Sequence, residues 1–439
     1  MTAFPPFPSG DSYRIVRARL PVCLLDASDG GDPSSEALIA VTLTIAGGKI
    51  AKIERSETAP PPPDGSPSID LDGGMVWPTC TDLHTHLDKG FIWKRAPNPS
   101  GNWRDAIDAV RVDQTAHWTA EDVAARMEFG LRCAYAHGTS AIRTHIDSMG
   151  KQADISWPVL SEMRRRWQGR ITLQGSALAP LGVFETAEGE HIANLVAEHG
   201  GVLGTFALDD ANASPKLDRL FAMARDRNID VDIHADETAN PASNCLEQVA
   251  EATIRHAYQG RVTAGHCCSL SVRPPAEAAR TIIKVAEAGM AIVSLPLCNL
   301  YLQDRQPAPH TPRWRGVTAI RELAAGGVAV AVGSDNTRDP FYAYGDLDPV
   351  EVFSQAVRIA HLDHPWGGWV RAITATPSTV MKVPGGGLLR TGAAADLILF
   401  RARGWVELLA RPSAPRLVVR NGKALTETAP DYRELDAIL

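Results

Sequence analysis

Two histidines separated by one residue, His84 and His86, are the first side chains whose type and spacing could do chemistry. They follow an apolar run, Met75–Cys80, that we predict to be a short buried strand. Because side chains alternate faces along a strand, residues two apart point the same way. Two adjacent imidazoles are half of a metal site, and imidazole suits zinc and iron. An isolated His-x-His is more often a structural pair, so the prediction depends on the rest of the chain.

Three later strand-like segments end in the residue types that such a site lacks. His234 ends one segment, His266 ends the next, and Asp335 follows the last. Chance rarely places two histidines and an aspartate at separate strand ends. We therefore predict that His84, His86, His234 and Asp335 bind a divalent ion, Zn²⁺ or Fe²⁺, with His266 in reserve. A catalytic metal site of this kind keeps one position open for water.

The elements that must position these residues alternate between strand-like and helix-like sequence. The predicted strands are Met75–Cys80, Ser140–Asp147, Arg170–Leu178, Gly201–Ala207, Ile229–His234, Arg261–His266, Ala291–Pro296 and Val328–Gly333. The predicted helices between them include Ala120–His137, Leu217–Arg227, Cys245–Ala257, Ala276–Ala288 and Val317–Ala325. This alternation predicts an α/β fold, a parallel (β/α)8 TIM barrel, in which active sites lie at the carboxyl ends of the strands.

Both ends of the chain are predicted to be rich in β-structure. Residues 13–55 alternate between apolar and polar side chains around a Gly47-Gly48 turn, and residues 395–400 and 415–423 are strand-like. We predict a β-sandwich domain from residues 1–74 and 380–439, and a metal-binding TIM-barrel domain from residues 75–379. The prolines at 60–63 predict an extended connection.

The composition is that of a soluble globular protein, with 44% hydrophobic and 22% charged residues among 439. A net charge of −7 without a basic run argues against nucleic-acid binding. The chain lacks an apolar stretch of about 18 residues, which argues against a membrane partner. Seven cysteines without C-x-x-C spacing suggest reduced thiols and a cytoplasmic location. A small-molecule partner is expected, and the composition leaves open whether the chain forms a homo-oligomer.

The residues described so far resemble the amidohydrolase superfamily, in particular its cytosine deaminase-like branch. The resemblance covers nearly the whole chain. Its specific segments are His234-Ala235-Asp236-Glu237 and the Pro-Leu-x-Asn-x-x-Leu-Gln pattern of residues 296–303. The other segments that carry it are residues 84–88, 143–147, 261–266, 315–318 and 335–340.

The resemblance implies a role for each candidate residue. It places the metal ligands at His84, His86, His234 and Asp335, a proton-shuttling glutamate at Glu237, and a histidine that holds and polarises the attacking water at His266. Binuclear members use a carboxylated lysine on the fourth strand, and residues 170–178 and 201–207 contain no lysine. One divalent ion is therefore expected. Asp88 and Asp236 are expected to orient histidines rather than to catalyse.

Two departures from cytosine deaminases concern the substrate. Residues 179–182 offer no glutamine for a pyrimidine edge, and Asn336 replaces a second carboxylate. The Ser-Asp-Asn-x-Arg-Asp and His-Thr-His-x-Asp-Lys patterns are closer to N-isopropylammelide amidohydrolase, an s-triazine enzyme. We expect a hydrolytic deaminase of a nitrogen heterocycle, whether pyrimidine, purine, pterin or triazine, with cytosine a poor substrate.

The residues also predict how the chemistry is shared. His266 and Asp335 would take the proton of the attacking water, and Glu237 would protonate a ring nitrogen so that the amine leaves as ammonia. Gln303 and Asn336 are candidates to read polar ring edges, and Trp314 and Phe341 to stack on the ring, although both aromatics could equally be packing. The alternatives are a non-catalytic metal-binding barrel, or an amidohydrolase of a substituted-amino s-triazine or a cyclic amide. The missing lysine disfavours the cyclic amide.

Overall fold

The computed structural model describes residues 4–55, 67–208, 210, 212–306 and 309–439. The Pro-rich connection predicted at residues 60–63 lies outside these ranges. The chain forms two compact units. The first comprises Met1–Thr81, Ala134–Ser140 and Asp348–Ala429, and the second Asp82–Cys133, Ala141–Leu347 and Pro430–Leu439.

The strands of the second unit run parallel. They are β6 (Cys80–Thr85), β7 (Thr139–Asp147), β8 (Thr172–Leu178), β9 (Leu203–Ala207), β10 (Val231–Ala235), β11 (Val262–His266), β12 (Ala291–Ser294) and β13 (Ala329–Val332). One sheet has the order β6-β7-β8 and the other β13-β12-β11-β10-β9. Isolated parallel bridges also join Ser176 to Val202 and Thr85 to Asp335. This parallel α/β arrangement is consistent with a TIM-barrel-like domain.

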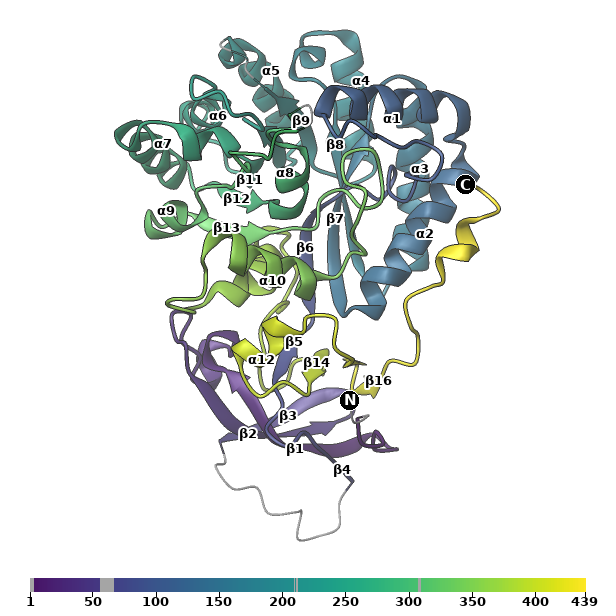
Figure 1. Cartoon of the computed structure of the whole chain (residues 1–439), viewed down its shortest axis with the longest axis vertical. Helices are drawn as coiled ribbons and strands as arrows, with labels where there is room; N and C mark the ends of the chain where they lie inside the picture. The colour runs from purple at the N-terminus through teal and green to yellow at the C-terminus, as the bar shows by residue number, and fades with distance from the viewer. Residues whose placement is uncertain (1–3, 56–66, 209, 211, 307–308) are drawn as a thin grey trace. The chain divides into compact units, whose positions relative to one another are not determined.

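Helices alternate with these strands along the chain. They are α1 (Trp103–His117), α2 (Ala120–Ala136), α3 (Lys151–Arg166), α4 (Ala187–Glu198), α5 (Ala213–Asp226), α6 (Cys245–Arg255), α7 (Pro275–Glu287), α8 (Pro296–Leu302) and α9 (Ile320–Ala325). Figure 1 shows α3 to α7 outside the strands of this unit. On α6, Leu246, Val249, Ala250 and Thr253 are buried, at the spacing of one helical face. Helix α6 thus turns one largely apolar face towards the interior of the unit.

The apolar run predicted as the first barrel strand divides into two strands. Val76–Pro78 forms β5, which pairs antiparallel with β14 (Leu397–Phe400) in the first unit. The last hydrogen bond on that side comes from the backbone N–H of Thr79, which donates to the carbonyl of Asp396 at 3.2 Å. The next pairing begins where the backbone N–H of Cys80 donates to the carbonyl of Gly138 at 3.0 Å. His84 therefore lies within β6, and His86 follows it directly.

The described residues of the first unit form two sheets. One is β3-β2-β1-β4, from β1 (Ser12–Pro21), β2 (Leu38–Ala46), β3 (Lys49–Arg55) and β4 (Ser68–Asp70), and the other is β16-β15-β14-β5, with β15 (Arg416–Arg420) and β16 (Lys423–Ala424). Ile15 and Leu43 from one sheet and Leu397 and Val419 from the other share one buried core. The unit also holds α10 (Pro349–Ala360), α11 (Ala375–Val380) and α12 (Trp405–Ala410). Within the described part of the chain, no helix has the length and apolarity needed to cross a bilayer.

Candidate active site

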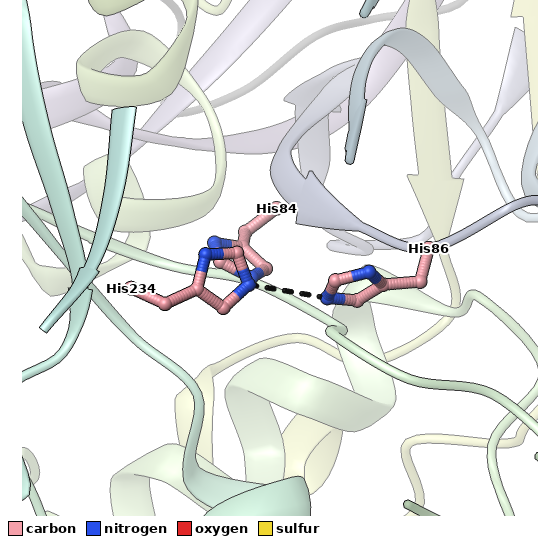
Figure 2. A group of neighbouring side chains, drawn as sticks. All are labelled: His84, His86 and His234. Atoms are coloured by element: carbon pink, nitrogen blue, oxygen red, sulfur yellow. Dashed lines mark hydrogen bonds between the residues drawn. The ribbon is translucent and has the colours of Figure 1, made fainter. Parts of the chain in front are cut away.

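Three imidazoles and one carboxylate converge within the second unit. The Nε2 atoms of His234, on β10, and of His86 lie 3.4 Å apart, and Figure 2 shows these rings beside that of His84. Asp335 Oδ1 lies 3.1 Å from His86 Nε2 and 3.5 Å from His84 Nε2. All four side chains are buried. The structure thus brings together the four residues that the sequence suggested as ligands.

The donor atoms of this cluster fit a divalent cation. Both ring nitrogens of His84, Nδ1 of His86 and of His234, and both carboxylate oxygens of Asp335 are buried without a hydrogen-bond partner among the described residues. Burial lowers the pKa of each of the three histidines well below 6.5, so their rings are neutral. Burial also raises the pKa of Asp335 to about 7. Neutral imidazoles with one carboxylate are a donor set for zinc or iron.

Two other groups of donors share His84. One adds His266 and Asp335 and therefore belongs to the same site, whereas the other adds His145 and Asp232. Asp232 already accepts a hydrogen bond from the guanidinium of Arg143 at 2.7 Å, with both side chains fully buried. The positive charge of Arg143, held against this carboxylate, would repel a metal ion bound there. The cluster with His86 and His234 is thus the better metal site.

Backbone conformations at the site are unusual for residues with side chains. Asp236, His266 and Asp335 have φ angles of 52°, 65° and 62°, in the left-handed region. Such conformations cost roughly 1–3 kcal/mol each and tend to cluster at functional sites. At His266 and Asp335 the chain turns sharply as its strand ends, which keeps both side chains beside the metal-binding histidines.

Asp236 and Asp88 take other partners than the histidines that the sequence analysis expected. The carboxylate of Asp236 accepts hydrogen bonds from the Ser243 hydroxyl and from the backbone N–H groups of Cys245 and Leu246 at the start of α6. Asp236 therefore fixes a helix N-terminus. Asp88 accepts from the backbone N–H of Asp147 at 2.8 Å.

A carboxyl group and a further histidine lie beside the metal-binding cluster. Glu237 Oε1 is 3.6 Å from His266 Nδ1, and the Glu237 side chain is only 7% exposed. Burial, and then the charge of Asp335, raises the pKa of Glu237 well above 4.5. Glu237 can therefore keep a proton at a pH at which an exposed glutamate has lost it. A buried acid with a perturbed pKa in a cleft is typical of general acid–base catalysts.

A cavity of about 180 Å³ opens onto these groups. His86, His234, Glu237, His266 and Asp335 line it, together with two predicted substrate contacts, Asn336 and Phe341, and with Trp103, Pro180 and Phe206. Most of its remaining wall is apolar, as expected of a site for a planar ring.

The other two predicted substrate contacts lie elsewhere. Gln303 lines a neighbouring cavity of about 540 Å³ that shares Trp103, Phe206 and Glu237 with the first. Its side-chain amide donates to the carbonyl of Glu237 at 3.3 Å. Trp314 is half-buried and lines neither of these two cavities.

Helix α1 supplies a wall of the cavity that the sequence analysis did not predict. Trp103, Ile107, Val110, Arg111 and Gln114 all face it, at helical spacing. The Asn102 side chain caps the helix by accepting from the backbone N–H of Asp105. A possible N-cap followed by apolar residues three and four apart was the available signal.

An ion pair in the cavity wall was also missed. Lys89 is buried, its ammonium lies 2.7 Å from Asp147 Oδ1 and 5.4 Å from the centre of the Phe341 ring, and both members of the pair line the cavity. The signal for Lys89 was its place directly after the His-x-His segment. Asp147 ends a predicted strand, as the metal-binding candidates do.

A buried His–Asp cluster beside a protonatable glutamate, in a parallel α/β unit, defines a metal-dependent hydrolase. The comparison with family models agrees, because the model described as "Amidohydrolase family" matches residues 194–425. The chain belongs to this family.

Individual relatives extend the similarity to the whole chain. The chain is 48% identical to a pterin deaminase of Rhizobium rhizogenes over 98% of both proteins. It is 23% identical to the N-isopropylammelide isopropyl amidohydrolase of Pseudomonas sp. strain ADP, over 82% of this chain and 88% of that protein. The crystal structure of 5-methylcytosine deaminase from Klebsiella pneumoniae with 5-fluorocytosine superposes with a TM-score of 0.80, at 22% identity over 95% of this chain and 98% of that one. The comparisons confirm the predicted family and the predicted class of enzyme, a hydrolase of carbon–nitrogen bonds.

Proposed function

We propose that the chain is a metal-dependent deaminase of a pterin, replacing the exocyclic amino group by oxygen and releasing ammonia. The observation that carries the proposal is 48% identity to a pterin deaminase along 98% of the chain. The cavity supports it, because Glu237, His266 and the metal-binding cluster open onto one space with aromatic walls at Trp103, Phe206 and Phe341. Such walls suit the flat faces of a fused heterocycle.

His84, His86, His234 and Asp335 would hold the ion. A bound divalent ion supplies a Lewis acid that lowers the pKa of water, so that a nucleophile is available near neutral pH. Asp335, whose second oxygen has no partner among the described residues, can accept a proton from the attacking water. Glu237 can pass its proton to the ring nitrogen beside the attacked carbon, and the proton taken from the water can then pass to the amino group, which leaves as ammonia. The apolar walls exclude bulk water from the reacting atoms.

One Zn²⁺ or Fe²⁺ per chain is the metal content we propose. The support is the absence of lysine from β8 and β9, where a bridging carboxylated lysine would have to lie. The three imidazoles and the one carboxylate together offer one donor set, which is enough for a single ion. Neutral nitrogen donors suit both metals, so the donor set alone does not choose between them.

The finer architecture is also a proposal. We infer that the eight strands of the second unit close into a barrel, supported by the parallel bridges from Thr85 to Asp335 and from Ser176 to Val202. The shared core of the two antiparallel sheets supports a β-sandwich in the first unit. We keep the predicted domains, 1–74 with 380–439 and 75–379, as hypotheses. Seven free, buried cysteines support a cytoplasmic location.

A substrate panel tests the proposed function. Metal-loaded protein would be incubated with pterin, cytosine, guanine, ammelide and N-isopropylammelide, and ammonia and isopropylamine would be measured separately. We expect ammonia from pterin at the highest kcat/KM, and loss of this activity after chelation with recovery on adding Zn²⁺ or Fe²⁺. Isopropylamine as the main product would assign the chain to the s-triazine amidohydrolases instead. No product from any compound with full metal loading would support the non-catalytic alternative.

A further inference from the structure

Asn299 lies between the two proton-handling side chains of the site. It is fully buried in α8. Its amide nitrogen Nδ2 is 3.2 Å from Glu237 Oε1 and 3.0 Å from His266 Nδ1, and these two acceptor atoms are 3.6 Å from each other. One side-chain amide therefore bridges an acid and an imidazole that do not bond each other.

The hydrogens of the amide determine the tautomer of His266. An asparagine Nδ2 carries two hydrogens and no lone pair for accepting, so it donates one bond to each neighbour. His266 Nδ1 must then be an acceptor, and the hydrogen of the neutral ring lies on Nε2. Nε2 is buried and has no protein partner among the described residues. With the amide in this orientation, His266 has an N–H to offer in the cavity that it lines.

The reversed amide would require a different protonation pattern. It would place Oδ1, an acceptor only, against Glu237 and His266. Both neighbours would then have to donate, so Glu237 would be protonated on Oε1 and His266 would carry its hydrogen on Nδ1. The two arrangements leave His266 Nε2 with opposite roles, and they can be distinguished by experiment.

The loop that follows α8 holds Asn299 in place. Gly316 has a φ of +65°, and a Cβ added there would lie 3.3 Å from Asn299 Cβ and 2.5 Å from Gln303 Cγ. The α8 helix therefore packs directly on the backbone of this loop. Two residues later, the hydroxyl of Thr318 donates to the carbonyl of His266 at 2.7 Å. One loop thus supports both Asn299 and His266.

We propose that Asn299 is a positioning residue that fixes His266 as the Nε2–H tautomer and holds the Glu237 carboxyl beside it. The inference rests on the proposed function. It changes the assignment of one proton, because His266 then donates from Nε2 to the oxygen that attacks the substrate. Asp335 and Glu237 remain as the groups that move protons, whereas His266 orients and stabilises that oxygen.

Kinetics of two variants test this role. Asn299→Ala removes both donated hydrogen bonds, and losing the partners of buried polar groups is expected to lower kcat for pterin by roughly ten- to a hundredfold. We expect KM to stay within about twofold and metal content to be unchanged, since Asn299 contacts neither ring nor ligand in this proposal. Asn299→Asp has nearly the same shape but cannot donate, so it should not restore kcat. Parental kcat in either variant would overturn the proposal.

The matched control is Thr253→Ala. Thr253 is buried in α6, and its hydroxyl donates to the carbonyl of Val249 at 2.8 Å. Replacing Thr253 by alanine also deletes a buried hydrogen bond. However, none of the residues that line the two cavities belongs to α6. We expect a lower melting temperature with parental kcat. If this control lost kcat as Asn299→Ala does, the effect would be one of stability and the proposal would be wrong.

A spectroscopic readout is independent of turnover. Zinc-loaded protein labelled with ¹⁵N-histidine would be compared with Asn299→Ala, and the His266 signals assigned by their loss in His266→Gln. We expect the Nε2–H pattern for His266 in the parent and a shift towards Nδ1–H or exchange in the variant. An Nδ1–H ring in the parent would overturn the proposal in favour of the reversed amide. If pterin were not deaminated at all, the proposed function would fail while the tautomer could still be read.

Discussion

The backbone N–H of Asp335 donates a hydrogen bond to the carbonyl of His84 at 2.8 Å. This bond joins a candidate ligand three residues after β13 to one within β6, more than half the chain away. The backbones of these two candidate ligands are thus joined directly by main-chain pairing. We therefore expect the donor set to be preformed in the metal-free protein, which makes metal uptake a binding step and not a folding step.

The affinity of the site for a metal ion should depend on pH through the protonation of one group, Asp335. Burial raises the pKa of Asp335 to about 7, whereas the three histidines have pKa values lowered well below 6.5 and stay neutral. Below about pH 7 binding must release one proton, so affinity should fall about tenfold per pH unit. Zinc titration with a competing chelator between pH 5 and 8 measures this slope. A flat profile, or release of two protons, would contradict the assignment, and Asp335→Asn should abolish the slope.

Glu237 and His234 should fail in different ways when substituted. Glu237→Gln keeps the volume but cannot supply a proton, so metal should be retained and turnover should fall about a hundred- to ten-thousandfold. His234→Ala removes a ligand, so it should lose the ion and the activity together. Metal content and kcat would be measured for both beside the parent. Near-parental turnover of Glu237→Gln with full metal would remove Glu237 from the mechanism.

One metal ion per chain is expected at the site. The reason is that β8 and β9 offer no lysine to bridge a second ion, and that Arg143 neutralises the nearest alternative carboxylate, Asp232. Elemental analysis of active protein after gel filtration gives the ratio. Two ions per chain that are both needed for activity would show that the binuclear arrangement had been wrongly set aside.

The buried acid should make stability depend on pH in the metal-free protein. The folded-state pKa of Glu237 is raised well above 4.5 by burial and by Asp335. The unfolded chain loses this proton near pH 4.5, so the stabilisation of the fold by the neutral carboxyl is fully present below that pH. It declines as pH rises towards the folded-state pKa. A glutamine at this position cannot ionise. In the presence of a chelator, the melting temperature of Glu237→Gln should therefore rise relative to that of the parent as the pH increases from 5 to 8. A constant difference across that range would contradict the raised pKa.

Cytosine should be a poor substrate. Where cytosine deaminases are expected to place a glutamine, Pro180 lines the cavity, and its side chain can neither donate nor accept a hydrogen bond. Losing a partner for a buried polar edge costs roughly 1–3 kcal/mol, or about ten- to a hundredfold in kcat/KM. Measured side by side, cytosine should fall at least that far below pterin. Equal efficiency would mean that another group reads the pyrimidine edge.

The metal-binding residues could be predicted because parallel strands bring their carboxyl ends together. His84, His234 and Asp335 are far apart in sequence, but each belongs to a strand or follows one, and the structure places them in one cluster. The first strand was predicted as a single strand because an apolar run gives no sign that its two halves pair in different sheets.

The substrate side could not be predicted in the same way. Asp, Arg and Gln residues lie beside the apolar residues of α1, so the apolar periodicity of this helix is weak. Gln303 and Trp314 belong to a segment whose path depends on tertiary contacts, such as the close approach of Gly316 to α8. Sequence spacing alone does not determine those contacts. Nor could it show that Asn299 would join Glu237 to His266.

The α1 helix has a consequence for the evolution of substrate range. Its Trp103, Ile107, Val110, Arg111 and Gln114 form one wall of the cavity, whereas the metal donors come from separate strands. A library restricted to those five codons would therefore vary the shape and polarity of the pocket while leaving every donor atom untouched. Natural sequence change in α1 can have the same effect. We therefore expect that relatives which share these metal ligands but act on other heterocycles differ first along this helix.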